Sequence, residues 1–555
     1  MMNWKMHLTN IYGEQTAKEW IPRLQDRIEA AKLIDKESQK ESQKERRQNI
    51  ILITYPDQIS EEAPKLVTFE KFAKNYLKGI FDVIHFLPFC PYSSDDGFSV
   101  IDYRRLDDGL GNWEDLERLA KDYTLMFDFV CNHVSSKSEW FKRCLRGEER
   151  FEGYFIEEDP ATDISKVIRP RTSPLLTPFP VNGKIKYFWT TFSDDQIDLN
   201  YGNPQVLYEI MDIFLSYLEK GGRWIRLDAI GFLWKEIGTS CMHHEKTHEI
   251  VKLMRSVMEE VCQEGRIITE TNVPHTDNIS YFGNGTDESH MVYQFPLPML
   301  VLYSFFKQDA RLLTAWAAEL ELPSDKTGFF NFLASHDGIG INPIRSIVPE
   351  EEIEALVAHL QEKSGALISY KEDQDGRKSA YEVNVSYFSA VKEDFDFATA
   401  KQRFLMAHAV LFGMKGDPAV YIHSYLGTEN YTEGVLKTGM NRTINRRKFT
   451  YDELMSELNR KDGEREQIRS AIEKLIRIRK GCDAFDTHAA QEVQKGPEEM
   501  FCFIRRGKSR TVQCLYNFSA GEAEMECTEG TDLLTGEKTS RRVVTEPYGF
   551  RWILI

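Results

Sequence analysis

The stretch "GGRWIRLDAIGF", residues 221–232, places Arg226 and Asp228 two positions apart inside a run of bulky apolar residues. Side chains alternate between the two faces of a strand, so the two charged groups are expected on one face, with Ile225 and Leu227 on the other. Charged side chains are rarely buried unless they are paired or take part in chemistry. The stretch therefore predicts a buried strand that ends in a carboxylate with a guanidinium beside it.

Polar groups of the same kinds end other apolar segments. These groups are His133 after "LMFDFVCN", Glu270 at the end of "RIITE", and His336 with Asp337 at the end of "FFNFLASHD". For any single carboxylate a structural ion pair is the more common explanation, but three at strand ends, with histidines and an arginine, favour an active site. Glycoside cleavage uses such a set, namely a carboxylate nucleophile, a carboxyl acid/base with a raised pKa, and groups that stabilise an oxocarbenium-like transition state. We expect Arg226 to keep Asp228 ionised, as a nucleophile requires at neutral pH.

Eight apolar segments with helical spacers must position these groups. They span residues 51–55, 83–88, 125–132, 224–230, 266–270, 290–295, 329–337 and 419–424. Apolar residues recur at helical spacing in 205–220 and again in 246–265, between predicted strands. Alternating strands and helices predict the α/β class, here a (β/α)8 TIM barrel with its site at the carboxyl ends of the strands.

Three other regions differ from this pattern. Residues 134–200 and 341–395 are predicted to be loop-rich insertions after the third and seventh strands of the catalytic barrel, which spans 49–489. Residues 490–555 show strand-like alternation and predict a small C-terminal all-β domain. Residues 1–48 form a charged extension that ends in the near-repeat "ESQKESQK", and we expect a solvated helix there.

Composition limits the partners. The 555 residues carry a net charge of −17, which argues against nucleic acid and anionic membranes as partners. Nine cysteines without a CxxC pair suit a reducing compartment. The opening residues lack the apolar core of a signal peptide and no long apolar stretch follows, so we expect a soluble cytoplasmic protein, and a homodimer is compatible with the sequence.

One motif suggests a metal, and we do not expect it to bind one. "HEKTH", residues 244–248, matches the H-E-x-x-H zinc pattern letter for letter. It falls at the start of a predicted barrel helix, and no third ligand is evident nearby in the sequence. The expected metal content is therefore none, and no cofactor is expected either.

Several segments resemble a known family. "RLDAIG", "ITETN", "LASHDG" and "FDFVCNH" are similar to the signature regions of the α-amylase superfamily, glycoside hydrolase family thirteen, from about residue 50 to the C-terminus. "LITYPDQ", "SSDDGFSVIDY", "RPRTSP", "TFSDDQIDLN" and "KEIGTSC" resemble its sucrose phosphorylase branch. The resemblance implies a retaining glycoside phosphorylase, which transfers a glucosyl unit from an α-glucoside to phosphate.

The resemblance also implies roles for individual residues. It makes Asp228 the nucleophile, Glu270 the acid/base and Asp337 the transition-state stabiliser. The residues that it places around the glucosyl unit are Asp95, Phe98, His133, Phe192, Gln196, Arg226, His336 and Arg442. Those that it places at the phosphate or acceptor are Arg171 and Tyr381, on the two insertions, together with Asn272 and Glu382.

Departures from the sucrose phosphorylase pattern bear on the substrate. Thr271 and Asn272 follow the acid/base where a histidine is usual, Glu382 stands where a glutamine is usual, and the N-terminal extension is additional. These features resemble the glucosylglycerate phosphorylases of the branch, which implies 2-O-α-glucosylglycerate as donor and D-glycerate as acceptor. Asn272 and His275 are then expected to add donors for the acceptor. Sucrose or glucosylglycerol phosphorolysis, α-glucoside hydrolysis and a non-catalytic scaffold remain alternatives.

Overall fold

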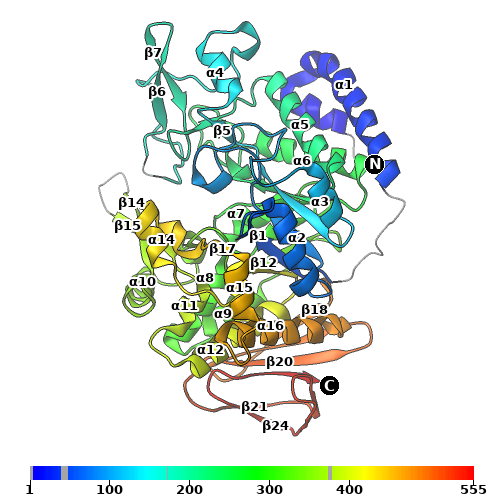
Figure 1. The fold of residues 1–555 in the computed structure, drawn as a ribbon, viewed down its shortest axis with the longest axis vertical. Coiled ribbons are helices and arrows are strands. Elements are labelled where there is room, and N and C mark those ends of the chain that lie inside the picture. Colours follow the sequence, from blue (N-terminus) through cyan, green and yellow to red (C-terminus); the bar gives the residue numbers. More distant parts are fainter. Residues whose placement is uncertain (1–3, 39–47, 172, 373–377) are drawn as a thin grey trace.

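The computed structural model describes residues 4–38, 48–171, 173–372 and 378–555. Within them, eight parallel strands close into a barrel in the order β1-β16-β12-β11-β10-β9-β4-β3 (Figure 1). These strands are β1 (Ile51–Thr54), β3 (Val83–Phe86), β4 (Thr124–Val130), β9 (Gly222–Asp228), β10 (Arg266–Thr269), β11 (Met291–Tyr293), β12 (Gly328–Phe332) and β16 (Asp417–Tyr421). Each overlaps one of the predicted apolar segments, so the barrel prediction is confirmed.

Helices connect the barrel strands and also follow the last of them. They include α2 (Lys65–Tyr76), α3 (Trp113–Leu119), α5 (Pro204–Glu219), α6 (Glu245–Val261), α7 (His275–Ile279), α8 (Pro296–Lys307), α9 (Arg311–Ala318), α12 (Phe397–Gly413), α15 (Tyr451–Leu458) and α16 (Glu464–Lys480). The periodic segments of the sequence correspond to α5 and α6. Helix α5 starts where the side chain of Asn203 accepts a hydrogen bond from the backbone N–H of Gln205, and Pro204 fits the first turn because it needs no hydrogen-bond partner there.

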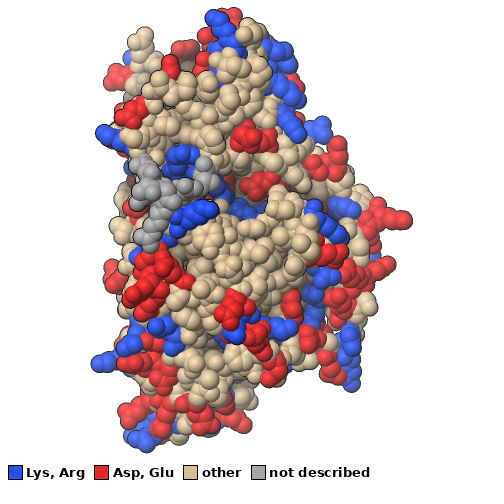
Figure 2. Space-filling model, turned by 90° about the vertical axis from the view of Figure 1, so that its left-hand side faces the viewer, with Lys and Arg blue, Asp and Glu red and all other residues tan. Residues whose placement is uncertain are grey.

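Two insertions follow the third and seventh barrel strands, as predicted. The first holds β5 (His133–Ser135), α4 (Glu139–Leu145), the hairpin β6 (Leu176–Val181) and β7 (Lys184–Trp189), and β8 (Gln196–Asp198). The second holds β13 (Ile339–Gly340), α10 (Glu350–Ser364), β14 (Leu367–Glu372), β15 (Lys378–Asn384) and α11 (Tyr387–Lys392), and is more regular than expected. After β16 come α14 (Thr432–Thr438) and the 3-10 helix η7 (Asn441–Asn445). Figure 2 shows one face of the molecule, where acidic and basic side chains gather at the rim of a hollow.

The C-terminal region is built from strands, as the alternation predicted. A six-stranded sheet has the order β18-β19-β20-β25-β22-β23, and β21 pairs with β24. The strands are β18 (Ala490–Gln494), β19 (Met500–Arg506), β20 (Thr511–Asn517), β21 (Ala523–Glu526), β22 (Gly530–Asp532), β23 (Lys538–Thr539), β24 (Arg542–Thr545) and β25 (Phe550–Leu554). The exact domain boundaries remain predictions.

The N-terminal helix α1 (Trp4–Ser38) is not the solvated helix that we expected. It packs against α5 and α6 (Figure 1). It buries apolar residues that recur at helical spacing among its charged ones. These are Trp4, Leu8, Ile11, Ala17, Leu24, Ile28 and Ala31. The expectation was wrong because it rested on the charged average composition of this segment, which does not reveal that one face of the helix is apolar.

Among the described residues, no helix combines the length and the apolar character that crossing a membrane would require.

Candidate active site

Strand β9 places the two charged groups of the opening motif on one face, as predicted. The guanidinium of Arg226 donates from Nη1 to Asp228 Oδ1 at 2.8 Å and to Asp128 Oδ1 at 2.7 Å. Arg226 is buried, with 2% of its surface exposed. Sequence analysis missed Asp128, although it stands between two phenylalanines in the quoted "FDFVCNH". A carboxylate flanked by aromatic residues in a buried strand was the available signal.

Glu270 directly follows β10 and reaches the end of β9. Its Oε2 accepts a hydrogen bond from the backbone N–H of Ala229 at 3.1 Å and lies 3.9 Å from Nη2 of Arg226. Ala229 has φ 51°, a left-handed conformation that non-glycine residues seldom adopt. Such strain tends to occur at functional sites, and here it aims an N–H at a carboxylate.

Burial sets the protonation of the two carboxylates that flank Arg226. It raises the pKa of Asp228 well above its usual range, against the opposing charge of Arg226 and with a further rise from Glu270. It also raises the pKa of Glu270, again against Arg226. Burial therefore opposes the ionisation of Asp228 that we expected from Arg226, whose guanidinium is shared with Asp128.

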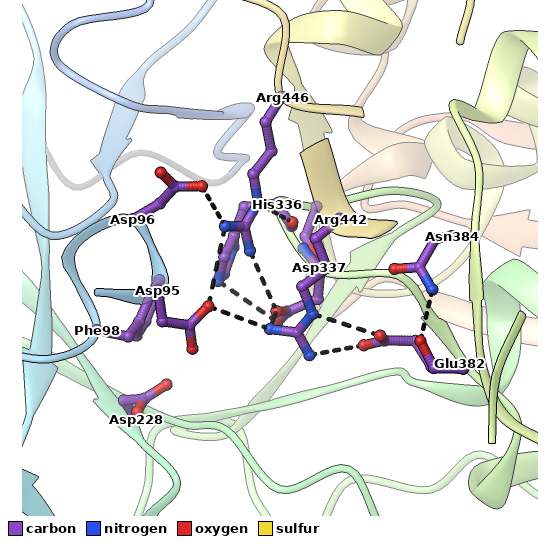
Figure 3. Close-up of polar contacts among 12 residues, drawn as sticks. Asp95, Asp96, Phe98, Asp228, His336, Asp337, Glu382, Asn384, Arg442 and Arg446 are labelled. Carbon is purple, nitrogen blue, oxygen red and sulfur yellow. Dashed lines mark hydrogen bonds and ion pairs between the residues drawn. The ribbon is translucent and has the colours of Figure 1, made fainter. Parts of the chain in front are cut away.

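The pKa of Asp337 shifts in the opposite direction, downward. Its Oδ1 pairs with Nη1 of Arg442 at 2.6 Å, and its Oδ2 lies 3.4 Å from Nε2 of His336 (Figure 3). Burial acts to raise the pKa of Asp337, but Arg442, followed by His336 and Arg446, outweighs it and holds that pKa well below its usual value. Burial lowers the pKa of His336 to about 3, so the imidazole is neutral at physiological pH.

A second arginine, four residues after Arg442, completes this cluster, and sequence analysis missed it. Arg446 donates from Nε to the backbone oxygen of His336 at 2.7 Å and pairs with Asp96 at 2.5 Å. Asp95 lies 3.9 Å from Arg446 and 4.0 Å from Arg442. The signal was the spacing of "NRTINR", since Arg442 and Arg446 stand four residues apart at the 3-10 helix η7.

Aromatic and polar side chains from the strand-end loops form one wall. The ring of Phe98 stacks on that of His336 with centroids 4.7 Å apart. The backbone oxygen of Phe98 meets Nε2 of His133 at 2.9 Å and Nε2 of Gln196 at 3.0 Å. Phe192 lies 5.3 Å from His133, ring to ring. The structure thus brings together side chains that the family resemblance placed around the glucosyl unit, namely Phe98, His133, Phe192, Gln196 and His336.

A pocket opens between these groups at the end of the barrel. Its lining consists of Ile53, His85, Arg226, Glu270, Tyr293, Phe295, Phe332, Ser335, His336 and Asp337. Within the described part of the chain, Nδ1 of His85 and Nδ1 of His336 are buried without a hydrogen-bond partner. Two unpartnered ring nitrogens at a polar pocket suit a ligand rich in hydroxyl groups.

The acceptor candidates lie on the two insertions and after β10. Arg171 donates from Nη1 to the hydroxyl of Tyr381 at 2.8 Å, so the two insertions meet through these residues. Asn272 is exposed and lies against Gly340, where an added Cβ would fall 2.5 Å from Nδ2 of Asn272.

Two other acceptor candidates contact residues that were not expected at the acceptor. Glu382 is buried, and its carboxylate pairs with Nη2 of Arg442 at 2.6 Å. His275, expected to add a donor, lies instead near the ring of Phe329, with centroids 6.5 Å apart. Neither Glu382 nor His275 lines the pocket.

The two histidines of the zinc-like motif "HEKTH" contact different carboxylates. His244 lies 3.3 Å from Glu236, and His248 pairs with Glu288 at 2.7 Å. In the part of the chain that the structure describes, no three His, Cys, Asp or Glu residues are grouped so that they could hold a metal ion.

Known proteins share this architecture. The profile of the α-amylase catalytic domain matches residues 71–373. The chain belongs to the α-amylase family. Among curated members, a glucosylglycerate phosphorylase of Escherichia coli (strain K12) is 49% identical over 483 residues, covering 86% of each chain. That of Spirochaeta thermophila is 48% identical, covering 86% of this chain and 81% of the relative.

Solved structures at lower identity share the fold alone. A crystal structure of sucrose 6F-phosphate phosphorylase from Thermoanaerobacter thermosaccharolyticum superposes with a TM-score of 0.75 at 23% identity, covering 90% of this chain and 98% of that one. Isomaltulose synthase from Klebsiella sp. LX3 gives a TM-score of 0.64 at 15% identity, with 92% and 99% covered.

Proposed function

We propose that the chain is a retaining glycoside phosphorylase that cleaves 2-O-α-glucosylglycerate with inorganic phosphate, releasing α-glucose 1-phosphate and D-glycerate. The observation that carries the substrate is the 45–49% identity to three proteins named glucosylglycerate phosphorylase. Relatives named for sucrose, sucrose 6(F)-phosphate or glucosylglycerol are 27–29% identical.

The site supports a double displacement with Asp228 as nucleophile and Glu270 as acid/base. Because burial raises the pKa of both carboxyls, the pair tends to hold one proton. Arg226 contacts Asp228 at 2.8 Å but Glu270 only at 3.9 Å, which favours the negative charge on Asp228 and the proton on Glu270. This is the protonation state from which a retaining reaction starts.

The two steps balance in protons. Asp228 attacks the anomeric carbon while the proton of Glu270 passes to the glycosidic oxygen, so that glycerate leaves and a glucosyl ester remains. A phosphate oxygen then attacks that carbon, its proton passes to Glu270, and the bond to Asp228 breaks. Two inversions retain the α configuration. Although burial acts to raise the pKa of Asp337, Arg442 holds it down, so Asp337 stays ionised and stabilises the positive charge of the transition state.

The acceptor side must take two anions in turn, phosphate and glycerate. Arg226 and Arg442 pair with carboxylates, whereas Arg171 donates to the hydroxyl of Tyr381. A guanidinium with a neutral partner keeps its charge available for an anion. Arg171 is therefore the residue that we propose to bind phosphate and glycerate, with Tyr381 orienting it.

Product analysis tests the proposal. The protein is incubated with glucosylglycerate, sucrose and glucosylglycerol, with and without phosphate, and the first product is followed by proton NMR. We expect phosphate-dependent α-glucose 1-phosphate, fastest from glucosylglycerate. Free glucose at the same rate without phosphate would identify a hydrolase, preference for sucrose would identify a sucrose phosphorylase, and a β-anomer would exclude double displacement.

A further inference from the structure

Tyr12, in the N-terminal helix, contacts two segments that lead to the candidate active site. Its hydroxyl donates to the backbone oxygen of Tyr201 at 2.7 Å, and its ring lies 6.4 Å from that of Trp234. Gly13 follows with φ 80° and ψ 164°, so α1 kinks directly after Tyr12. A positive φ of this size favours glycine, which indicates that the kink is a specific feature of the helix.

The first connection runs through Tyr201, just beyond β8. The hydroxyl of this buried tyrosine donates to the backbone oxygen of Cys131 at 2.5 Å. Tyr12 is therefore hydrogen-bonded to the backbone of Tyr201, and the side chain of Tyr201 is hydrogen-bonded to the backbone at the end of β4. Buried hydrogen bonds of this kind fix geometry, because breaking one leaves a polar group without a partner.

The second connection runs through the segment after the candidate nucleophile. Trp234 is followed by Lys235, whose ammonium contacts Asp198 at 2.6 Å and Oδ1 of Asn132 at 2.7 Å. The amide of Asn132 lies 3.2 Å from Nδ1 of His133. Both connections therefore end on residues 131–133, at the carboxyl end of β4.

We propose that Tyr12 is a positioning residue, which sets the place of His133 in the glucosyl subsite from outside the barrel. The geometric part of this inference stands by itself, and its kinetic part rests on the proposed function. His133 meets the backbone oxygen of Phe98, which stacks on His336, so a displacement at residues 131–133 reaches the wall of the pocket. Small displacements of such groups are costly because the reacting atoms need close alignment.

The test compares three variants. Tyr12→Phe removes only the hydroxyl, and Tyr12→Ala removes the ring as well. Trp20→Ala is the matched control, because Trp20 is an aromatic residue of the same helix that packs on Tyr208 of α5, with centroids 5.8 Å apart. Hydrogen–deuterium exchange of residues 125–135 is measured without ligand, and KM and kcat are measured for phosphorolysis of glucosylglycerate.

For Tyr12→Ala we expect faster exchange at residues 125–135 and a KM for the glucoside raised about tenfold, the equivalent of one or two lost hydrogen bonds. Tyr12→Phe should show a smaller change of the same kind. Trp20→Ala should lower the melting temperature while leaving KM and exchange at 125–135 unchanged.

Unchanged exchange in Tyr12→Ala, or equal KM shifts in Tyr12→Ala and Trp20→Ala, would overturn the inference. Because exchange needs no substrate, it still decides the matter if the unmodified protein fails to cleave glucosylglycerate. That failure would count against the proposed function alone.

Discussion

Arg442 of η7 and Glu382 of β15 form a two-point ion pair, with Nη2–Oε1 at 2.6 Å and Nε–Oε2 at 3.3 Å (Figure 3). Gly338 permits this approach, since an added Cβ there would lie 2.5 Å from Cγ of Glu382. The same guanidinium contacts Asp337, so Glu382 acts on the candidate transition-state stabiliser through Arg442. Glu382 is thus placed to orient Arg442, which sequence analysis did not foresee.

Glu382→Gln should therefore lower kcat/KM for glucosylglycerate by about tenfold, because the amide keeps the shape but loses the charge-assisted bonds to Arg442. Steady-state kinetics measure this. The control is Glu350→Gln, which loses an exposed ion pair with Arg345 in the same insertion and should leave kcat/KM unchanged. Equal effects of the two substitutions would assign Glu382 no special role.

Asp228→Asn should abolish turnover, because no glucosyl ester can form. Glu270→Ala should slow glycosidic cleavage by about 10²–10⁴-fold, the usual contribution of general acid–base catalysis. With α-glucose 1-phosphate as donor, azide should partly restore the Glu270 variant, measured as released phosphate, since phosphate leaves without an acid and azide attacks the ester without help from a base. Rates are measured as released glycerate, and near-normal activity in either variant would refute the assigned roles.

Glu270→Gln should stabilise the fold in a pH-dependent way. The folded-state pKa of Glu270 is raised above its ordinary value of 4.5, so the fold favours the protonated carboxyl. Its contribution is fully present below pH 4.5 and is lost as pH rises through the raised folded-state pKa. The neutral amide avoids this loss, so the gain in melting temperature over the unmodified protein should be larger at pH 7 than at pH 4. Calorimetry at both pH values checks it, and a gain independent of pH would contradict the raised pKa.

Arg171→Ala should weaken use of phosphate and glycerate together, while sparing transfer to small neutral acceptors when the α-glucose 1-phosphate donor is saturating. In synthesis from α-glucose 1-phosphate, the unmodified protein should prefer D-glycerate to fructose and glycerol, because a site built for a carboxylate leaves donors unpaired with neutral acceptors. Initial rates over acceptor concentration measure both points. Arg169→Ala is the control, since Arg169 is a neighbouring arginine whose guanidinium donates to the backbone of Ser173. Loss of rate with glycerol as well would place Arg171 in the chemistry common to all acceptors.

The sequence by itself determined the barrel and its three strand-end carboxylates. Parallel strands are buried on both faces, so they appear as short apolar runs whose polar ends stand out. The pairing of Arg226 with Asp228 followed from alternation within one strand, which is a local property. Asp337 and Glu270 stood out because each is a charged residue at the end of an apolar run.

Only the tertiary structure decided which distant groups meet. Asp128 shares Arg226 because closure of the barrel sets β4 beside β9, and Glu382 reaches Arg442 because a hairpin folds back over η7. Burial reversed the expected pKa direction of Asp228, since desolvation depends on everything packed around a group and not on its neighbours in the chain. The docking of α1 was likewise invisible in its average composition, because its apolar face has meaning only against the helices that cover it.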